Sequence, residues 1–519
     1  MPKIKVHEKA LAHLSRGLYR SPASALRELV SNAWDANATV VRVDTAYPTF
    51  LQVAVDDNGD GFTLGDFERV MKGGIGNSDK RTDGIVPKHG RPLIGRLGIG
   101  MFGIAQIAPG FTITSKTADG SGFRARIKLY DLLKEKLDKE DADVVTETPL
   151  AGESLKEVHI GTYEIDDDFD PSTRATGTTI IADDLHPQFT TAFRDSISHP
   201  GFKPVPSTWA EAINILSKVE SLQLLGDYWR LLWELAAATP VCYVNEHAVP
   251  EGAIRADQRR LKEYDFRVFV DDVELLKPVN LKDESVDYLV HKIPPTSKKV
   301  YAKDVSFHGY IAARDGSQIK PDELRGLMLR IKNIGIGYYD QTLLDFRVNQ
   351  GPRSRWITGE IYVDTGLEDA LNVDRDSFNR FHPEFRHIQS FIHDMLKKEG
   401  FPDVYRKMES RSEHKVQKKE KTRKKHLATV VGEQLDSDVT IRVAPASDEA
   451  TEDPRAKVTE TKDGVVVTLP PPESLHTKKA AQQSAAAILA VFEVALREAT
   501  KERQREVFTD LLLKLLKGW

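Results

Sequence analysis

Cysteine is almost missing from this sequence: Cys242 is the single one in 519 residues. One thiol cannot build a disulfide framework, and it cannot supply a cysteine-rich zinc site. A reducing compartment is therefore expected, and the cytoplasm is the natural one. Cys242 lies in residues 239–244, which read like a strand, so we predict a buried and unreactive thiol.

Long apolar runs are missing as well. The first residues lack the apolar segment of a secretory signal, and no stretch of about 18 apolar residues could span a membrane. We therefore expect no membrane contact. An excess of positive charge is also lacking, since the formal net charge is −5. This argues against a wholly basic nucleic-acid binder, although a local basic patch is compatible with it.

The chain does contain enough apolar sequence for real cores. Hydrophobic residues make up 40 % of the chain and charged residues 29 %. At about 150 residues per domain, the length predicts roughly three domains.

The most informative feature is a row of polar residues on a predicted helix, residues 26–36. Glu28, Asn32 and Asp35 stand at positions i, i+4 and i+7, which places them on one helix face. Polar groups beside an apolar stripe are costly to bury without a partner, and a nucleotide with a magnesium ion would be such a partner. The stripe consists of Leu26, Leu29, Val30 and Ala33.

Two glycine clusters follow. The first comes after a strand-like run at residues 51–55 and contains Asp57, Gly59 and Gly61, which allow a tight turn beyond the strand end. The second, residues 95–103, has the pattern of a phosphate-cradling loop that runs into a helix. Alone, the first cluster also fits a calcium loop or a plain turn. The order and spacing of all three segments within about 80 residues favour a nucleotide site.

These segments resemble the GHKL ATPases, which include gyrase B, the ninety-kilodalton heat-shock chaperones, histidine kinases and MutL. The helix matches the motif E-x-x-x-N-x-x-D-A, the first glycine cluster matches D-x-G-x-G, and Gly95, Gly98 and Gly100 match the glycine-rich lid. Residues 177–181 resemble the strand that closes the adenine pocket. The sequences of residues 26–36, 75–80 and 94–103 most resemble those of the heat-shock chaperone and MORC-like branches. Trp34 differs, because the chaperones usually have a small residue at this position.

The resemblance implies an α+β fold: a Bergerat-type nucleotide-binding α/β sandwich, an α/β transducer-like middle domain and a helical C-terminal region. It implies ATP and Mg²⁺ as cofactors. Glu28 would be the general base, a role worth about 10²–10⁴-fold in rate. Asn32 would offer an oxygen to magnesium, which prefers oxygen ligands. Asp57 would accept a hydrogen bond from the adenine amino group, supported by Asp35 and Thr178.

The lid would meet the phosphates through Lys80 and the backbone of Gly95, Gly98, Ile99, Gly100, Met101 and Phe102. A solvated glutamate and a solvated lysine are the plain alternatives for Glu28 and Lys80. The histidine-kinase branch is disfavoured, because its members usually lack a carboxylate base at the Glu28 position.

A basic residue of the middle domain should reach the γ-phosphate. Residues 371–376 closely resemble the chaperone segment L-N-V-S-R-E, and this resemblance assigns the role to Arg375. An arginine suits the task because its charged fork can contact phosphate oxygens as charge redistributes. A plain surface ion pair with Asp374 or Asp376 is the alternative for Arg375, and Lys332 is the alternative for the role.

We expect six regions along the chain. They are an ATP-binding domain at 1–190 with an acidic insertion at about 131–170, a helical connector at 191–240, the middle domain at 241–402, a basic linker or helix at 403–427, a small strand-rich or irregular segment at 428–472, and an amphipathic C-terminal helix at 473–519. The basic stretch Arg406–Lys425 is either a solvated linker or a nucleic-acid contact. The apolar stripe of the last helix needs a cover, and a homodimer or a partner protein would provide it.

The expected activity is hydrolysis of ATP to ADP and phosphate in a conformational clamp of the heat-shock chaperone type, with a protein as client. The alternative is a MORC-like or MutL-like ATPase that acts on DNA in compaction, repair or anti-phage defence. A regulator that binds ATP without turnover is a third possibility, and the presence of Glu28 argues against it.

Overall fold

The structure is a computed structural model. It describes residues 21–73, 90–94, 103–104, 106–129, 161–245, 247–281, 288–314, 318–346, 354–372, 376–402 and 404, and the backbone of three strands between 440 and 468. The chain divides into two compact units, Met1–Val404 and Tyr405–Trp519. Among the described helices, none combines the length and the apolar character needed to cross a lipid bilayer.

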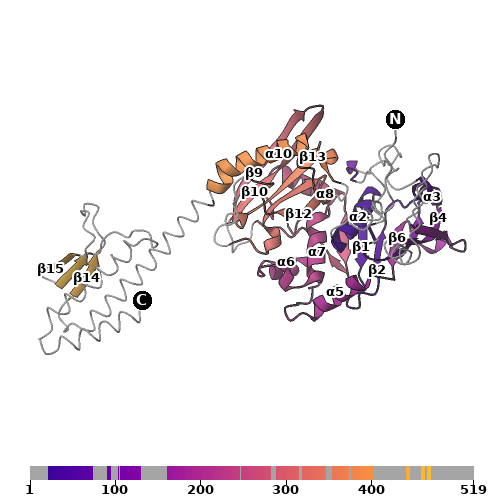
Figure 1. Cartoon of the computed structure of the whole chain (residues 1–519), viewed down its shortest axis with the longest axis horizontal. Helices are drawn as coiled ribbons and strands as arrows, with labels where there is room; N and C mark the ends of the chain where they lie inside the picture. The colour runs from indigo at the N-terminus through magenta and orange to yellow at the C-terminus, as the bar shows by residue number, and fades with distance from the viewer. Residues whose placement is uncertain are drawn as a thin grey trace, which may run out of the picture. The chain divides into compact units, whose positions relative to one another are not determined.

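The first unit contains an eight-stranded sheet with the order β5-β4-β3-β6-β2-β1-β7-β8 (Figure 1). Neighbouring strands are antiparallel, except that β1 and β7 are parallel. Alternate residues of β3 and β4 are buried, as expected for strands with one face on a core. The strands are β1 (Val40–Asp44), β2 (Val53–Asp57), β3 (Gly110–Lys116), β4 (Gly122–Leu129), β5 (Gly161–Ile165), β6 (Gly177–Ala182), β7 (Arg267–Val270) and β8 (Val273–Glu274).

Helices of this unit share one large core with the sheet. α7 contacts α2, α5 and the second sheet, and α2 also contacts β2. The helix α2 begins after Ser21, whose Oγ accepts a hydrogen bond from the Ser24 N–H at 3.2 Å, and Pro22 occupies its first position. The helices are α2 (Pro22–Asp35), α3 (Leu64–Gly73), α5 (Pro187–Ser198), α6 (Trp209–Leu216), α7 (Asp227–Ala238) and α8 (Ala253–Glu263).

The contacts of Trp34 explain why a large residue occupies this position of α2, where the chaperones usually have a small one. The indole is fully buried, and its Nε1 donates a hydrogen bond to the Pro92 carbonyl at 2.8 Å. The guanidinium of Arg91 lies 4.5 Å from the centre of the ring system. Trp34 therefore fixes the segment 91–94, which precedes the glycine-rich motif, against α2.

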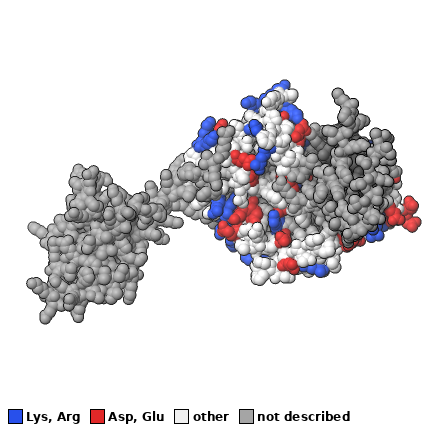
Figure 2. All heavy atoms as spheres, viewed as in Figure 1, with Lys and Arg blue, Asp and Glu red and all other residues white. Residues whose placement is uncertain are grey.

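A second, five-stranded sheet has the order β12-β11-β13-β10-β9. A separate core lies between this sheet and α10 (Pro383–Met395), which continues into a π-helical turn, η7 (Leu396–Gly400). α7 and α8 contact β12 and β10 respectively. The strands are β9 (Tyr288–Val300), β10 (Lys303–Arg314), β11 (Gly326–Ile331), β12 (Ile334–Asp340) and β13 (Ile357–Thr365). Figure 2 shows positive and negative side chains interspersed over the described surface.

Two local expectations differ from the structure. The strand-like run at 266–270, placed by the sequence in the middle domain, pairs in parallel with β1 of the first sheet, where Val268 and Val270 enter the first core. Residues 239–244 form no extended strand; Tyr243 makes one isolated bridge to Lys277. Cys242 is partly buried, and its burial raises the pKa of the thiol.

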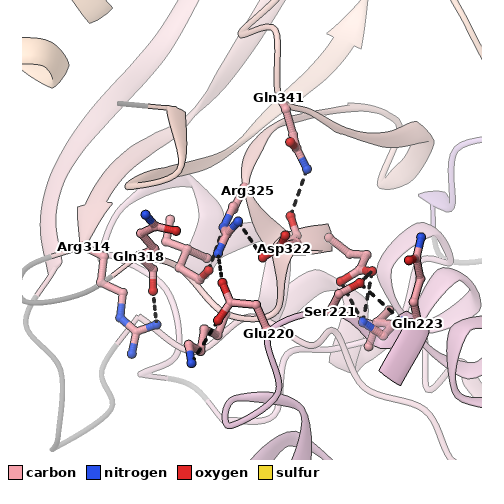
Figure 3. Close-up of polar contacts among 12 residues, drawn as sticks. Glu220, Ser221, Gln223, Arg314, Gln318, Asp322, Arg325 and Gln341 are labelled. Carbon is pink, nitrogen blue, oxygen red and sulfur yellow. Dashed lines mark hydrogen bonds and ion pairs between the residues drawn. The ribbon is translucent and has the colours of Figure 1, made fainter. Parts of the chain in front are cut away.

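An ion-pair network joins the helical connector to the second sheet (Figure 3). Arg325, almost fully buried, donates to Glu220 at 2.8 Å and pairs with Asp322 at 2.5 Å. Next to it, the Glu323 carboxylate accepts hydrogen bonds from the Ser221 hydroxyl at 2.7 Å and from the Leu222 N–H at 3.0 Å. The connector is thus fastened to the loop that leads into β11.

The second unit contains a three-stranded sheet with the order β14-β16-β15. β14 (Thr440–Ala444) is parallel to β16 (Gly464–Thr468), and β15 (Lys457–Thr461) is antiparallel to it. The basic stretch Arg406–Lys425 and the predicted C-terminal helix lie outside the described residues, as does most of the acidic insertion.

Candidate functional site

The three polar residues of the first motif lie on α2, as the sequence predicts. Glu28 and Asp35 are buried, with 2 % and 1 % of their surface exposed. From Ala23 to Asp35, Asn32 alone is only partly buried. The predicted apolar stripe is fully packed into the core. Asn32 is therefore the polar residue of this stretch that is not fully buried.

Asp57 ends β2, directly opposite Thr178 of the neighbouring strand β6. The Gly59 N–H donates a hydrogen bond to Asp57 Oδ1 at 2.8 Å. Burial raises the pKa of Asp57 to about 6, although hydrogen bonds from the backbone of Gly59 and Thr178 act in the opposite direction. A carboxylate poised in this way is an acceptor for a ligand N–H group.

Glycine is required at two positions around Asp57. Gly61 has φ +66°, and a Cβ there would lie 2.2 Å from the Lys116 carbonyl oxygen of β3. Gly177 has φ +132°, and a Cβ there would lie 2.0 Å from the Asp57 carbonyl oxygen. Both contacts are impossible for a side chain, so the turn after β2 packs backbone to backbone on β3 and β6. This close packing holds Asp57 in place.

Ser115 is a site residue that the sequence analysis missed. It is fully buried on β3. Its hydroxyl accepts a hydrogen bond from the Phe62 N–H at 2.9 Å and lies 3.1 Å from the Thr178 hydroxyl. The signal was a serine at an inward-facing position of an otherwise alternating strand. Ser115 ties the turn after β2 to Thr178.

Asp35 and Arg91 fix the approach to the lid motif. Asp35 Oδ1 accepts a hydrogen bond from the Ile94 N–H at 2.7 Å. The Arg91 guanidinium donates to the carbonyls of Ala38 at 2.7 Å and Tyr264 at 3.0 Å. Asp35 was expected beside adenine; here its described contact is with the segment that leads into the glycine-rich motif.

Arg27, also missed, links the helix to the region of the second sheet. Its Nη2 lies 3.4 Å from Glu28 Oε1, and its Nη1 lies 2.6 Å from Asp376 Oδ1. Asp376 is buried, and the side chain of Arg375 lies outside the described residues. The segment that follows Arg375 is thereby attached next to the expected general base.

Lys332 makes a second link of this kind. It lies in the two-residue turn between β11 and β12, where Lys332 and Asn333 both have positive φ. Its Nζ donates to the Leu93 carbonyl at 3.1 Å and pairs with Glu368 at 3.3 Å. Lys332 thus contacts the segment just before the glycine-rich motif.

The remaining predicted site residues lie outside the described residues, and their roles stay predictions. They are Lys80, Gly95, Gly98, Ile99, Gly100, Met101, Phe102 and Arg375.

The described groups fit a magnesium nucleotide. A carboxylate such as Asp57 suits an exocyclic amine, and an amide oxygen such as that of the partly buried Asn32 suits a magnesium ion. Magnesium keeps several waters and is usually held by one or two protein oxygens together with substrate phosphates.

Comparison with known proteins agrees with this geometry. Residues 19–162 match the family described as histidine kinase-, DNA gyrase B-, and HSP90-like ATPase. A putative type II restriction enzyme, HgiDII of Herpetosiphon aurantiacus, is 40 % identical over 101 residues. This match covers 19 % of the present chain and 16 % of that relative.

Among solved structures, the N-terminal domain of a DNA repair protein aligns with 74 % of this chain and 96 % of its own, at 10 % identity and a TM-score of 0.37. Similarity at this level carries no argument about function. Residues 19–162, which carry the motifs on α2 and β2, are therefore a region of the GHKL ATPase type.

Proposed function

We propose that this protein binds ATP with Mg²⁺ and hydrolyses it to ADP and phosphate, with Glu28 as the general base. Asp57 receives the adenine amino group, and Asn32 supplies an oxygen to the magnesium ion. The ion, when bound, neutralises phosphate charge and orients the phosphates. A carboxylate that takes a proton from the attacking water accelerates hydrolysis about 10²–10⁴-fold.

Burial supports this role for Glu28. Its carboxylate is withdrawn from solvent on α2, and the neighbouring Arg27 guanidinium lies at 3.4 Å. Taking a carboxylate out of water costs free energy, and a functional role accounts for that cost. The arrangement is suited to a base that faces a ligand.

The observation that carries the proposal is the pair of contacts from the second-sheet region. Asp376 reaches Arg27, beside Glu28, and Lys332 reaches Leu93, beside the glycine-rich motif. Through these contacts, a nucleotide-dependent movement of either segment would be transmitted to the second sheet. We propose a conformational clamp, in which bound ATP orders the lid, brings Arg375 to the γ-phosphate and closes a homodimer.

A second candidate is an ATPase that acts on DNA. Two observations favour it: the relative with 40 % identity is named as a putative restriction enzyme, and the stretch Arg406–Lys425 is dense in basic residues. Clustered lysine and arginine residues bind nucleic acid by releasing counterions from phosphates. The two candidates share the ATPase and differ in the client.

Replacement of Glu28 tests the ATPase. Glu28→Gln and Glu28→Ala should retain binding of a fluorescent ATP analogue, while phosphate release falls at least about 100-fold. Glu211→Ala removes an exposed glutamate of α6 and should leave both unchanged. Turnover at the wild-type rate in Glu28→Ala would remove Glu28 from its role, and loss of binding in both variants would assign it a structural one.

The client is tested with the same variant. Glu28→Ala loaded with ATP should trap the closed state, and its captured partners can be recovered from cell extract. Protein partners that resist nuclease support the chaperone-type clamp. Recovery of DNA that nuclease removes supports the second candidate.

A further inference from the structure

The hairpin of β9 and β10 extends beyond the rest of its sheet (Figure 1). β9 and β10 pair along their whole length, from Lys303 opposite Val300 to Arg314 opposite Tyr288. β13 pairs with β10 only from Ser306 onwards. Residues 298–305, which we name the hairpin tip, are therefore a two-stranded ribbon without a third strand.

The hairpin tip is basic and carries an exposed aromatic ring. Its sequence, KKVYAKDV, contains three lysines and one acid. Lys298 and Lys299 are exposed and make no ion pair with the residues that the structure describes. Lys303 is paired with Asp369. Tyr301, at the turn, is 84 % exposed. Figure 2 shows blue side chains gathered where this hairpin projects, at the top of the view.

Protection of a sheet edge accounts for part of this pattern. β9 is an edge strand, and lysines and prolines on such strands prevent pairing with another sheet. This explains Lys292 and the Pro294–Pro295 pair in β9. It does not explain Tyr301, because an exposed aromatic ring at a turn costs solubility and protects no strand edge.

The geometry of the ribbon suits a groove lined by phosphates. Successive residues of a strand point to opposite faces. Lys298 is paired with the buried Val305 and lies near His387 of α10, whereas Lys299 is paired with the exposed Asp304 on the opposite face. The major groove of B-DNA is about 12 Å wide and admits a two-stranded β-ribbon. The exposed turn, with Tyr301 and Ala302, would then lead into the groove, and Lys298 and Lys299 would reach the phosphates at its rim.

We propose that the hairpin tip binds double-stranded DNA, with Lys298 and Lys299 on the phosphates and Tyr301 at the groove. The inference deepens the DNA-directed candidate for the function and rests on it for the choice of duplex DNA. It does not depend on ATP turnover.

Binding of the full chain to a short labelled DNA duplex, measured by fluorescence anisotropy over a range of salt, tests the proposal. Lys298→Glu/Lys299→Glu should lower the affinity at least about tenfold and reduce the slope of log K against log salt by about 2, since each phosphate contact contributes roughly 0.9. Tyr301→Ala should lower the affinity and leave the slope unchanged.

The matched control is Lys203→Glu/Lys218→Glu, which changes the net charge equally at two exposed lysines elsewhere in the same unit. It should change the affinity less than about threefold. Circular dichroism and basal ATPase activity of all variants should equal those of the wild type, because none of these residues has a contact with the nucleotide-site residues that the structure describes.

Three results would overturn the proposal: wild-type DNA binding in the hairpin double variant, an equal loss in the control, or tighter binding of single-stranded DNA, RNA or an acidic peptide than of duplex. The proposed ATPase activity is tested independently of the hairpin. If Glu28→Ala hydrolyses ATP normally while the hairpin variants lose DNA, the ATPase role of Glu28 is wrong and the hairpin inference stands.

Discussion

Arg27 and Asp376 are 349 positions apart in the chain, and their side chains meet at 2.6 Å in the protein interior. Only 3 % and 1 % of these side chains are exposed. Burial lowers the pKa of Arg27, but Asp376 and Glu28 outweigh this effect and raise it, so the guanidinium stays charged. One cation therefore serves the expected general base and the segment after Arg375.

Breaking this ion pair should destabilise the protein strongly. Arg27→Ala leaves two buried carboxylates without their cation, at a cost of about 3–5 kcal/mol in the free energy of unfolding. Arg27→Met/Asp376→Leu should recover part of that loss, because it removes the Asp376 carboxylate but still leaves Glu28 without the Arg27 guanidinium. Arg267→Ala is the control, because Arg267 and Glu274 also meet at 2.6 Å but are largely exposed, so the expected cost is below about 1 kcal/mol. Urea unfolding measures all three; equal costs would show that burial does not matter here.

The two basic candidates for the γ-phosphate can be ranked by turnover. Arg375→Met should lower kcat about 10²–10³-fold, because the arginine stabilises charge that develops in the transition state. Lys332→Met should lower it less than about tenfold, since its Nζ is engaged by Leu93 and Glu368. Lys320→Met, which removes a partner of Glu220, is the control. The reverse ranking would transfer the role to Lys332.

Asp57 should make adenine binding sensitive to pH. Its pKa is raised from 3.8 to about 6, so the carboxylate becomes protonated as pH falls through 6 and accepts a hydrogen bond less well. Adenosine, which has no phosphate to titrate, should bind progressively more weakly below pH 6 in calorimetry. Asp57→Asn should bind weakly at every pH. The same shift means that folding loses stability as pH rises from 3.8 to 6, and this dependence should be absent in the variant.

Gly61 and Gly65 provide a matched pair. Gly61→Ala forces a side chain into a left-handed conformation and against Lys116, so we expect a loss of at least about 2 kcal/mol and loss of nucleotide binding. Gly65 lies in α3, and a Cβ there would meet its nearest neighbour at 3.8 Å. Gly65→Ala should stabilise the protein by up to about 1 kcal/mol. Thermal unfolding compares them, and a tolerated Gly61→Ala would contradict the backbone packing.

His308 should stabilise the fold below neutral pH. Burial alone would lower its pKa, but hydrogen bonds to Asp257 at 2.5 Å and Asp364 at 3.3 Å outweigh burial and raise the pKa from 6.5 to about 9. The stabilisation is complete below pH 6.5 and disappears as pH rises through 9.

His308→Gln should therefore cost up to about 3 kcal/mol more at pH 6 than at pH 9.5, at about 1.4 kcal/mol for each unit of pKa shift. Urea unfolding at the two pH values gives this difference. His247→Gln, at an exposed position, should change stability by less than about 0.5 kcal/mol at either pH. A cost for His308→Gln that does not change with pH would mean that its partners do not hold a proton on the ring.

The local parts of the site were predictable from the sequence. The spacing of Glu28, Asn32 and Asp35 and the apolar stripe between them specify α2, and the glycines after Asp57 specify the turn that ends β2. In these segments the information is contained in residues that are close in the chain, where side-chain periodicity and backbone requirements apply directly.

The long-range contacts were not predictable in this way. In the sequence, nothing distinguishes Arg27 from other helix arginines, because its partner Asp376 is far away in the chain. Ser115 likewise looks like an ordinary strand serine, because its contacts with Phe62 and Thr178 appear only in the folded protein. The strand β7 also looked like part of the middle domain, because no local pattern says which sheet a strand will join. Pairing between distant segments depends on the whole topology.

The parallel pairing of β7 with β1 has a consequence for how the protein is made. A nascent chain of 190 residues already carries the four nucleotide motifs, but the edge of β1 is still open. Synthesis must continue past Glu274 before the first sheet is complete. The helices between Pro187 and Glu263 are therefore synthesised before β7 can pair with β1.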